Sequence, residues 1–274
     1  MANVPGPAVA GWIGWALDAC FSPACAACRG PLGPDRRGPV CVACWSAIRT
    51  VSPPWCDRCG EPLQSWRRQP GGHTACARCR AHPPHFDHAR ACGLYEGTLR
   101  HIVHALKYHG HQSLGAPLGA LMREAGRDWL GHADVVVPVP LHPWRRLRRG
   151  FNQADILACA LGRPVWRVLR RRRLGAPQAT LSGDDRLANV RGAYGVSRSA
   201  SGTARARPRA VVLVDDVMTT GATLDACSQV LRDTGVEWIA ALTVARAAHV
   251  SVLSGEAAPR PRPPREPRPS TLRR

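Results

Sequence analysis

Hydrophobic residues change their spacing near residue 86 of the chain. Beyond that point, short aliphatic runs alternate with longer segments that are apolar at every third or fourth position. The aliphatic runs predict buried strands at 89–95, 134–140, 211–215 and 237–247. The periodic segments predict helices at 98–110, 115–130, 149–162 (entered through a loop) and 223–234. Strands that alternate with helices favour an α/β fold, with a parallel sheet covered by helices.

Other parts of the chain lack this pattern. Residues 1–19 predict a short amphipathic lead-in helix, and residues 20–82 are rich in cysteine and turns, which predicts a small separate module. The α/β domain is then expected at 83–248. Within it, residues 163–210 are rich in arginine and mostly patternless, which predicts a long mobile insertion. The tail, 249–274, is mainly proline and arginine and is expected to be disordered.

Eight of the twelve cysteines fall in four CxxC pairs. Each pair turns two sulfurs to one side, and two pairs complete a tetrahedral site for Zn²⁺. Consecutive pairing predicts one zinc ribbon from Cys25, Cys28, Cys41 and Cys44 and a second from Cys56, Cys59, Cys76 and Cys79. Interleaved pairing, and one ion with a vestigial second site, remain open. Redox dithiols are an alternative that four pairs in 55 residues disfavour.

Other potential metal ligands are expected to be bystanders. His73 and His82 lie close enough in sequence to replace a thiolate, but eight thiolates are already present. The remaining cysteines are expected to be ordinary small side chains; they are Cys20, Cys92, Cys159 and Cys227.

The chain is strongly basic, with a formal net charge of +19 and a single lysine, Lys107. Such a field attracts phosphate, although a solvated basic surface is the simpler interpretation. The first residues lack the basic start of a signal peptide, and no stretch reaches the roughly 18 apolar residues of a membrane span. Together with reduced thiols, this predicts a cytoplasmic protein without membrane insertion.

The segment 211–223, VVLVDDVMTTGAT, carries the most specific chemistry. A buried strand ends in two carboxylates, and a threonine-rich turn then enters a helix. Unpaired amides and the positive end of a helix dipole make such a turn an anion site. Two carboxylates beside it suit a sugar phosphate held with Mg²⁺. The simpler alternative is an acidic strand end followed by a threonine helix cap.

These residues resemble the 5-phosphoribosyl-1-pyrophosphate (PRPP) signature of type I phosphoribosyltransferases. From about residue 20 to 248 the chain also resembles the ComF family of competence-associated proteins, in which a zinc module precedes a phosphoribosyltransferase domain. The resemblance includes the CxxC pairs and VVLVDDVMTTGAT, together with ALKYHG (105–110), VVPVPLH (136–142), RGFNQA (149–154) and the spaced residues Gln178, Leu181, Arg186 and Asn189.

The resemblance implies roles for individual residues. Asp215 and Asp216 would be catalytic and hold the ribose hydroxyls, directly or through Mg²⁺ and water. The 5′-phosphate would bind the backbone amides and hydroxyls of Thr219, Thr220, Gly221, Ala222 and Thr223. Near the pyrophosphate we expect Leu141, His142, Arg145 and, from a lid at 170–190, Arg186; Lys107 would lie at the nucleotide edge. The alternative for Arg186 is a surface arginine, and the alternative for Lys107 is a solvated lysine at a helix end.

The family resemblance implies pentosyl transfer from PRPP and a role in DNA uptake during natural transformation, with single-stranded DNA and the uptake machinery as partners. No base-recognition motif is present, so the acceptor is open and nucleobase salvage remains an alternative. Another is a non-catalytic protein that handles single-stranded DNA and keeps the pocket. Trp45, Trp55 and Trp66 would suit base stacking, but we expect them to pack the small ribbons. A transcriptional regulator is disfavoured because no helix-turn-helix is recognisable.

Overall fold

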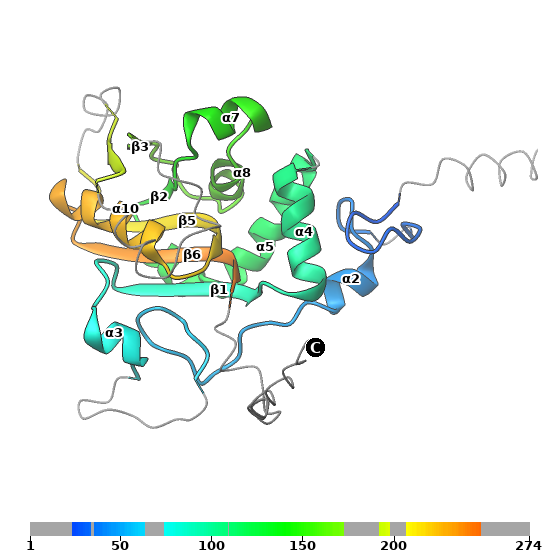
Figure 1. The fold of residues 1–274 in the computed structure, drawn as a ribbon, viewed down its shortest axis with the longest axis horizontal. Coiled ribbons are helices and arrows are strands. Elements are labelled where there is room, and N and C mark those ends of the chain that lie inside the picture. Colours follow the sequence, from blue (N-terminus) through cyan, green and yellow to red (C-terminus); the bar gives the residue numbers. More distant parts are fainter. Residues whose placement is uncertain are drawn as a thin grey trace, which may run out of the picture.

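The central element of the computed structural model is a four-stranded, wholly parallel sheet with strand order β1-β6-β5-β2 (Figure 1). The structure describes residues 24–33, 36–63, 74–108, 110–172, 192–197 and 207–247. The strands span His88–Leu94 (β1), Val135–Pro138 (β2), Ala210–Met218 (β5) and Trp238–Arg246 (β6). The predicted α/β fold is therefore confirmed.

Helices cover both faces of this sheet. One face carries α4 (Gly97–Tyr108), the 3-10 helix η1 (Gln112–Leu114), α5 (Gly115–Ala125), α6 (Arg127–His132) and α8 (Gln153–Cys159). The other carries α10 (Ala222–Asp233). Successive strand residues point to opposite faces. Accordingly Val212 and Val214 pack with the first group of helices, whereas Val211 and Leu213 pack with α10.

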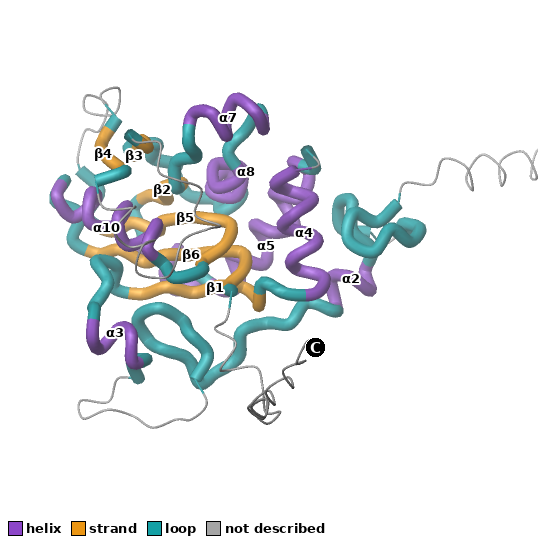
Figure 2. The backbone as a smooth tube through the Cα atoms, in the orientation of Figure 1, coloured by secondary structure: helices purple, strands orange, loops and turns teal. Residues whose placement is uncertain are grey.

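The two cysteine-rich segments lie at different places around the sheet (Figure 2). The first contains α2 (Val42–Ser46) and joins the hydrophobic core of α4 and α5. The second contains α3 (Ala77–Ala81) and packs with the core on the α10 side. The link between them follows the end of β1, where the amide of Leu94 donates to the carbonyl of Arg49 over 2.8 Å.

Some element boundaries differ from the sequence-based prediction. The single helix expected at 115–130 is broken at Gly126, where a Cβ would lie 2.7 Å from Cδ2 of Leu242. The apolar periodicity continues across the break because α6 also faces the core. Strand β5 does not end at residue 215 but continues to Met218, since β6 offers it backbone partners as far as Arg246.

The segment 163–210 contains more regular structure than predicted. Leu169–Arg171 (β3) and Tyr194–Val196 (β4) form a two-stranded antiparallel sheet. The intervening positions, including Arg186, lie outside the described residues, as do the predicted lead-in helix, the tail, Cys20, Trp66 and His73. Within the described ranges, no helix combines the length and the apolar character needed to cross a membrane.

Candidate functional site

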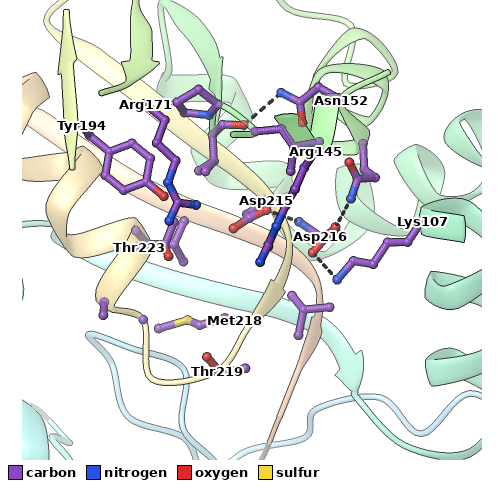
Figure 3. Close-up of a pocket in the computed structure, with 18 of the residues that line it drawn as sticks. Lys107, Arg145, Asn152, Arg171, Tyr194, Asp215, Asp216, Met218, Thr219 and Thr223 are labelled. Atoms are coloured by element: carbon purple, nitrogen blue, oxygen red, sulfur yellow. Dashed lines mark hydrogen bonds and ion pairs between the residues drawn. The ribbon is translucent and has the colours of Figure 1, made fainter. Parts of the chain in front are cut away.

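A cavity of about 290 Å³ opens where the carboxyl ends of β1, β2 and β5 meet (Figure 3). Ligands of open parallel sheets bind at this edge because loops and helix N-termini converge there. Tyr95 reaches the cavity just beyond β1, and Leu141 just beyond β2. Other lining residues include Lys107, Tyr108, Arg145, Arg149, Asn152, Gln153, Arg171, Tyr194, Asp215, Asp216, Met218, Thr219, Thr220, Gly221, Ala222 and Thr223.

The two aspartates differ in their surroundings. Asp216 is 7% exposed, and its carboxylate contacts Nζ of Lys107 at 2.9 Å and accepts a hydrogen bond from Nε2 of Gln153 at 3.1 Å. Among the described residues, the carboxylate of Asp215 accepts one hydrogen bond, from the backbone amide of Asp216 at 2.8 Å. Loss of water around Asp215, reinforced by the charge of Asp216, raises the pKa of Asp215 to about 7. Asp216 is thus held by two side chains, whereas the carboxylate of Asp215 has no side-chain hydrogen bond among the described residues.

Lys107 lies inside the site. Its burial alone would lower its pKa, but the carboxylates of Asp216 and Asp215 outweigh burial and raise the pKa of Lys107 above its usual range. The ammonium therefore stays charged at neutral pH. Lys107 lines the cavity, and its side chain is paired with Asp216 and largely buried, so it is not a solvated lysine at a helix end.

The threonine-rich turn has the geometry of an anion cradle. Gly221 has φ 81°, a left-handed conformation, and caps the N-terminus of α10. The amides of Thr219, Thr220 and Gly221 have no acceptor among the described residues, and the amide of Ala222 donates to the hydroxyl oxygen of Thr220 at 3.4 Å. The turn therefore presents free N–H groups beside the aspartates.

Arginines face these groups from the other side of the cavity. Arg145 comes from α7 (Pro143–Arg149) and Arg171 from β3, and Figure 3 draws both side chains directed into the same space. His142 does not line the cavity. Its ring accepts a bond from the amide of Trp144 at 3.2 Å, and slight burial, with the charges of Arg171 and Arg145, lowers the pKa of His142. His142 therefore caps α7, the helix that carries Arg145.

Sequence reasoning missed several lining residues. Gln153 lies in the RGFNQA motif, so this motif could have identified it. Arg171 is one of four consecutive arginines, and nothing in the sequence singles it out. Tyr194 and Arg171 come together only because β3 pairs with β4, which places the guanidinium 5.6 Å from the ring centre.

The cysteines form two separate clusters with consecutive pairing, Cys25/Cys28/Cys41/Cys44 and Cys56/Cys59/Cys76/Cys79. The sulfur atoms of Cys25 and Cys44 lie 3.8 Å apart, those of Cys28 and Cys41 3.9 Å apart, and those of Cys59 and Cys76 3.7 Å apart. Tetrahedral Zn–S bonds of about 2.3 Å require sulfur separations of about 3.8 Å, whereas a disulfide needs about 2.05 Å. The geometry fits structural zinc and disfavours redox dithiols.

The structure also bears on the pairing of the cysteines and on His82, Trp45 and Trp55. Interleaved pairing is wrong, because each ribbon closes on itself. His82 belongs to neither cluster, as expected. Trp45 donates from its indole to the carbonyl of Arg37 at 3.0 Å, and Trp55 lies 4.0 Å beneath the guanidinium of Arg90. Both tryptophans therefore pack within the protein.

Comparisons with known proteins agree with this architecture. Residues 16–80 match the family model of the double zinc ribbon domain. Competence protein F of Haemophilus influenzae is 32% identical over 239 residues, which cover 83% of this chain and 98% of that protein. DNA utilization protein YhgH of Escherichia coli K12 is 32% identical over 77% of this chain and 91% of its own length. Competence protein ComFC of Bacillus subtilis is 26% identical over 74% of this chain and 81% of its own length.

A solved structure described as the allosteric regulatory enzyme of purine biosynthesis aligns with a TM-score of 0.31 and 23% identity over 48% of this chain and 25% of that one. This likeness carries no inference about function. The curated relatives show the family, because identity above 30% extends along almost the whole Haemophilus protein. With its double zinc ribbon and its parallel α/β sheet, the chain belongs to the ComF family of competence proteins.

Proposed function

We propose that the cavity binds PRPP together with Mg²⁺ and that the protein acts in DNA uptake. One observation carries the proposal. Asp215 and the turn Thr219–Thr223, with its free amides, line one cavity at the carboxyl edge of a parallel sheet. Carboxylates suit ribose hydroxyls and Mg²⁺, while helix-start amides suit a phosphate. A cap without a ligand would not need two acids beside it.

The charges divide the cavity into three parts in this proposal. The 5′-phosphate binds the amides of Thr219–Thr223, and Asp215 and Asp216 hold the ribose hydroxyls. Arg145 and Arg171 lie across the cavity, where the pyrophosphate would extend. Lys107 holds Asp216 in place, because the ammonium and the carboxylate are 2.9 Å apart.

Transfer would break the bond between C1 of the ribose and the pyrophosphate oxygen, and the electron pair would leave with the pyrophosphate. A nucleophile would then form a bond to C1. Bound Mg²⁺ would neutralise part of the charge that grows on the leaving group. Arg145 and Arg171 are placed to stabilise the rest, since fixed cations in a site poor in water act strongly on developing charge. The acceptor that supplies the nucleophile is open.

The role in DNA uptake is supported by the relatives, which are named competence proteins and DNA utilization proteins. We also place the zinc module at residues 20–82, the catalytic domain at 83–248 and the protein in the cytoplasm, where reduced thiols can hold zinc.

Helix α7 supports a second candidate function, the handling of single-stranded DNA. It carries four arginines in seven residues, and Trp144 and Leu147 on it are 61% and 83% exposed. Tyr108 is 59% exposed, and the guanidinium of Arg149 lies 4.7 Å from its ring centre. Basic side chains beside exposed rings suit a phosphate backbone with stacked bases. This surface borders the cavity, so the two functions are compatible.

The first function is tested by calorimetry of Mg²⁺-PRPP with the full-length zinc-loaded protein. We expect saturable binding, and we expect Asp215→Asn with Asp216→Asn to abolish it. Asp128→Asn, an exposed acid on α6, is the matched control and should bind as the wild type does. Unchanged affinity in the double variant would remove the aspartates from the site. Pyrophosphate release with a panel of nucleobases then tests transfer.

The second function is tested by filter binding of single-stranded DNA at two salt concentrations. Affinity should fall steeply with salt, because phosphate contacts release counterions. Arg146→Gln with Arg148→Gln should weaken DNA binding and flatten its salt dependence. Neither arginine lines the cavity, so the double variant leaves the cavity lining unchanged. Arg127→Gln with Arg163→Gln removes equal charge outside α7. An equal loss of DNA affinity in the two double variants would mean that net charge, and not α7, attracts DNA.

A further inference from the structure

Arg246 is a fully buried arginine that the proposed chemistry does not use. It is the last residue of β6, it is 1% exposed, and it does not line the cavity. A buried guanidinium is stable only when its donors are satisfied and its charge is compensated. Its partners therefore indicate what it does.

One set of partners belongs to the second cysteine cluster. Nη1 of Arg246 donates to the carbonyl of Cys59 at 2.5 Å, and Nη2 lies 3.7 Å from the Cys59 sulfur. Nε donates to the carboxylate of Glu61 at 3.0 Å. Four thiolates around Zn²⁺ carry a net negative charge, and Glu61 adds to it. Arg246 supplies the positive charge that these buried groups require.

The other partner of Arg246, Met218, is the last residue of β5 and directly precedes the turn that forms the anion cradle. Nη1 lies 3.1 Å from the sulfur of Met218, which is 2% exposed and lines the cavity. Cε of Met218 lies only 2.7 Å from the position that a Cβ on Gly221 would occupy. The amide of Ala247 also donates to the carbonyl of Met218 at 2.9 Å. Met218 thus packs against the turn and is itself held by Arg246.

The first cluster has no equivalent link within the described ranges. The sulfur of Cys25 accepts bonds from the amides of Ala27 and Cys41, both at 3.4 Å and both inside its own ribbon. It packs beside α4, on the face opposite α10. Only the second cluster therefore shares a side-chain partner with the turn.

We propose that Arg246 is a positioning residue that couples the zinc ion of the second cluster to the turn 219–223. When the zinc leaves, the Cys59 knuckle loosens, Arg246 loses its fixed partners and Met218 no longer supports the turn. Coupling of binding free energies is reciprocal, so a ligand in the cavity raises the zinc affinity of that cluster, and we expect the zinc to leave more slowly. The ligand half of this statement depends on the proposed function, whereas the link between zinc and turn does not.

The link is tested without any ligand, by amide hydrogen exchange of the full-length protein. Cys79→Ser removes a ligand of the second cluster that does not touch Arg246, and Cys44→Ser is the matched change in the first cluster. We expect the hydrogen-bonded amides of Ala222 and Asp225, whose acceptors belong to the turn, to exchange at least about tenfold faster in Cys79→Ser and at the wild-type rate in Cys44→Ser. Equal exchange of these amides in the two variants overturns the proposal.

Two further variants examine Arg246 itself. Arg246→Lys keeps the charge but not the fork of donors, and zinc transfer from the second cluster to a chromogenic chelator should become about 10–100-fold faster, as for other partners of metal ligands. If this variant does not fold, Met218→Leu replaces it. This near-isosteric change should keep both zinc ions yet speed exchange of the amides of Ala222 and Asp225. Wild-type exchange in Met218→Leu, or unchanged zinc transfer in a folded Arg246→Lys, contradicts the coupling.

The ligand half is tested by adding Mg²⁺-PRPP to the wild type during chelation. The zinc of the second cluster should leave more slowly and that of the first at an unchanged rate. If the wild type does not bind PRPP, the proposed function fails, and hydrogen exchange still decides the link. If PRPP binds but leaves both zinc rates unchanged, the reciprocal coupling fails while the proposed function stands.

Discussion

The two cysteine clusters share one motif but differ in their surroundings. Cys28 of the first cluster is exposed and Cys41 is half-buried. In the second, Cys56, Cys59 and Cys79 are 0%, 1% and 5% exposed. The first packs beside α4, whereas the second packs against β1 and shares Arg246 with the turn beneath the cavity. Identical metal ligands can therefore lie in different surroundings, one cluster beside α4 and the other linked to the turn that lines the cavity.

The largest contrast is expected when each metal is removed separately. Cys79→Ser should destabilise the protein by about 3 kcal/mol more than Cys44→Ser, because it disturbs the buried pair of Arg246 and Glu61. The additional loss corresponds to roughly 10 °C in Tm. Calorimetric melting of both variants, with zinc analysis of each sample, checks this. Equal Tm values with one zinc lost from each would show that the two environments are energetically alike.

Two glycines offer a matched backbone test. Gly38 and Gly60 both have φ 67°, but a Cβ on Gly60 would lie 2.5 Å from the carbonyl oxygen of Ala89 on β1, while one on Gly38 meets Pro117 at 3.5 Å. Gly38→Ala should cost about 1 kcal/mol, from the left-handed conformation alone. Gly60→Ala should cost about 3 kcal/mol, because the second ribbon must move away from β1. Denaturant unfolding measures both, and similar losses would refute close packing of the second ribbon.

Ion pairs near the two ribbons should differ as well. Glu61 pairs with Arg246 in the interior, and Glu96 pairs with the exposed Arg49 that follows the first ribbon. Glu61→Gln keeps a hydrogen-bonding group but removes a buried charge, and it should destabilise by about 2 kcal/mol. Glu96→Gln should change stability by less than about 0.5 kcal/mol. The same unfolding assay compares them. A small effect of Glu61→Gln would mean that the zinc thiolates alone compensate Arg246.

The smallest effect concerns the cavity beside the second cluster. The pKa of Asp215, about 7 in the folded protein, lies above its ordinary value of 3.8, so the folded state retains a proton that the unfolded chain releases. This contribution to stability is complete below pH 4 and is lost as the pH rises through 7. Asp215→Asn should therefore raise Tm by roughly 3–5 °C at pH 8 relative to its effect at pH 6. A pH-independent difference in Tm would show that Asp215 is solvated normally.

The sequence by itself determined the elements and the chemistry that is local in the chain. Alternating strands and helices, the CxxC knuckles and the segment 211–223 all follow from patterns a few residues long, and periodicity or spacing expresses them directly. The cavity accordingly contains Asp215, Asp216 and Thr219–Thr223 together, as the turn motif predicts.

Only the tertiary structure decided which distant residues meet. Because β5 pairs with β6, strand β5 extends past the two aspartates to Met218, which lies opposite Arg246. The β3-β4 sheet selects Arg171 from four adjacent arginines, and packing against β1 distinguishes the second cluster from the first. These outcomes depend on contacts between residues up to 187 positions apart, such as Arg246 and Cys59, which a local pattern does not record.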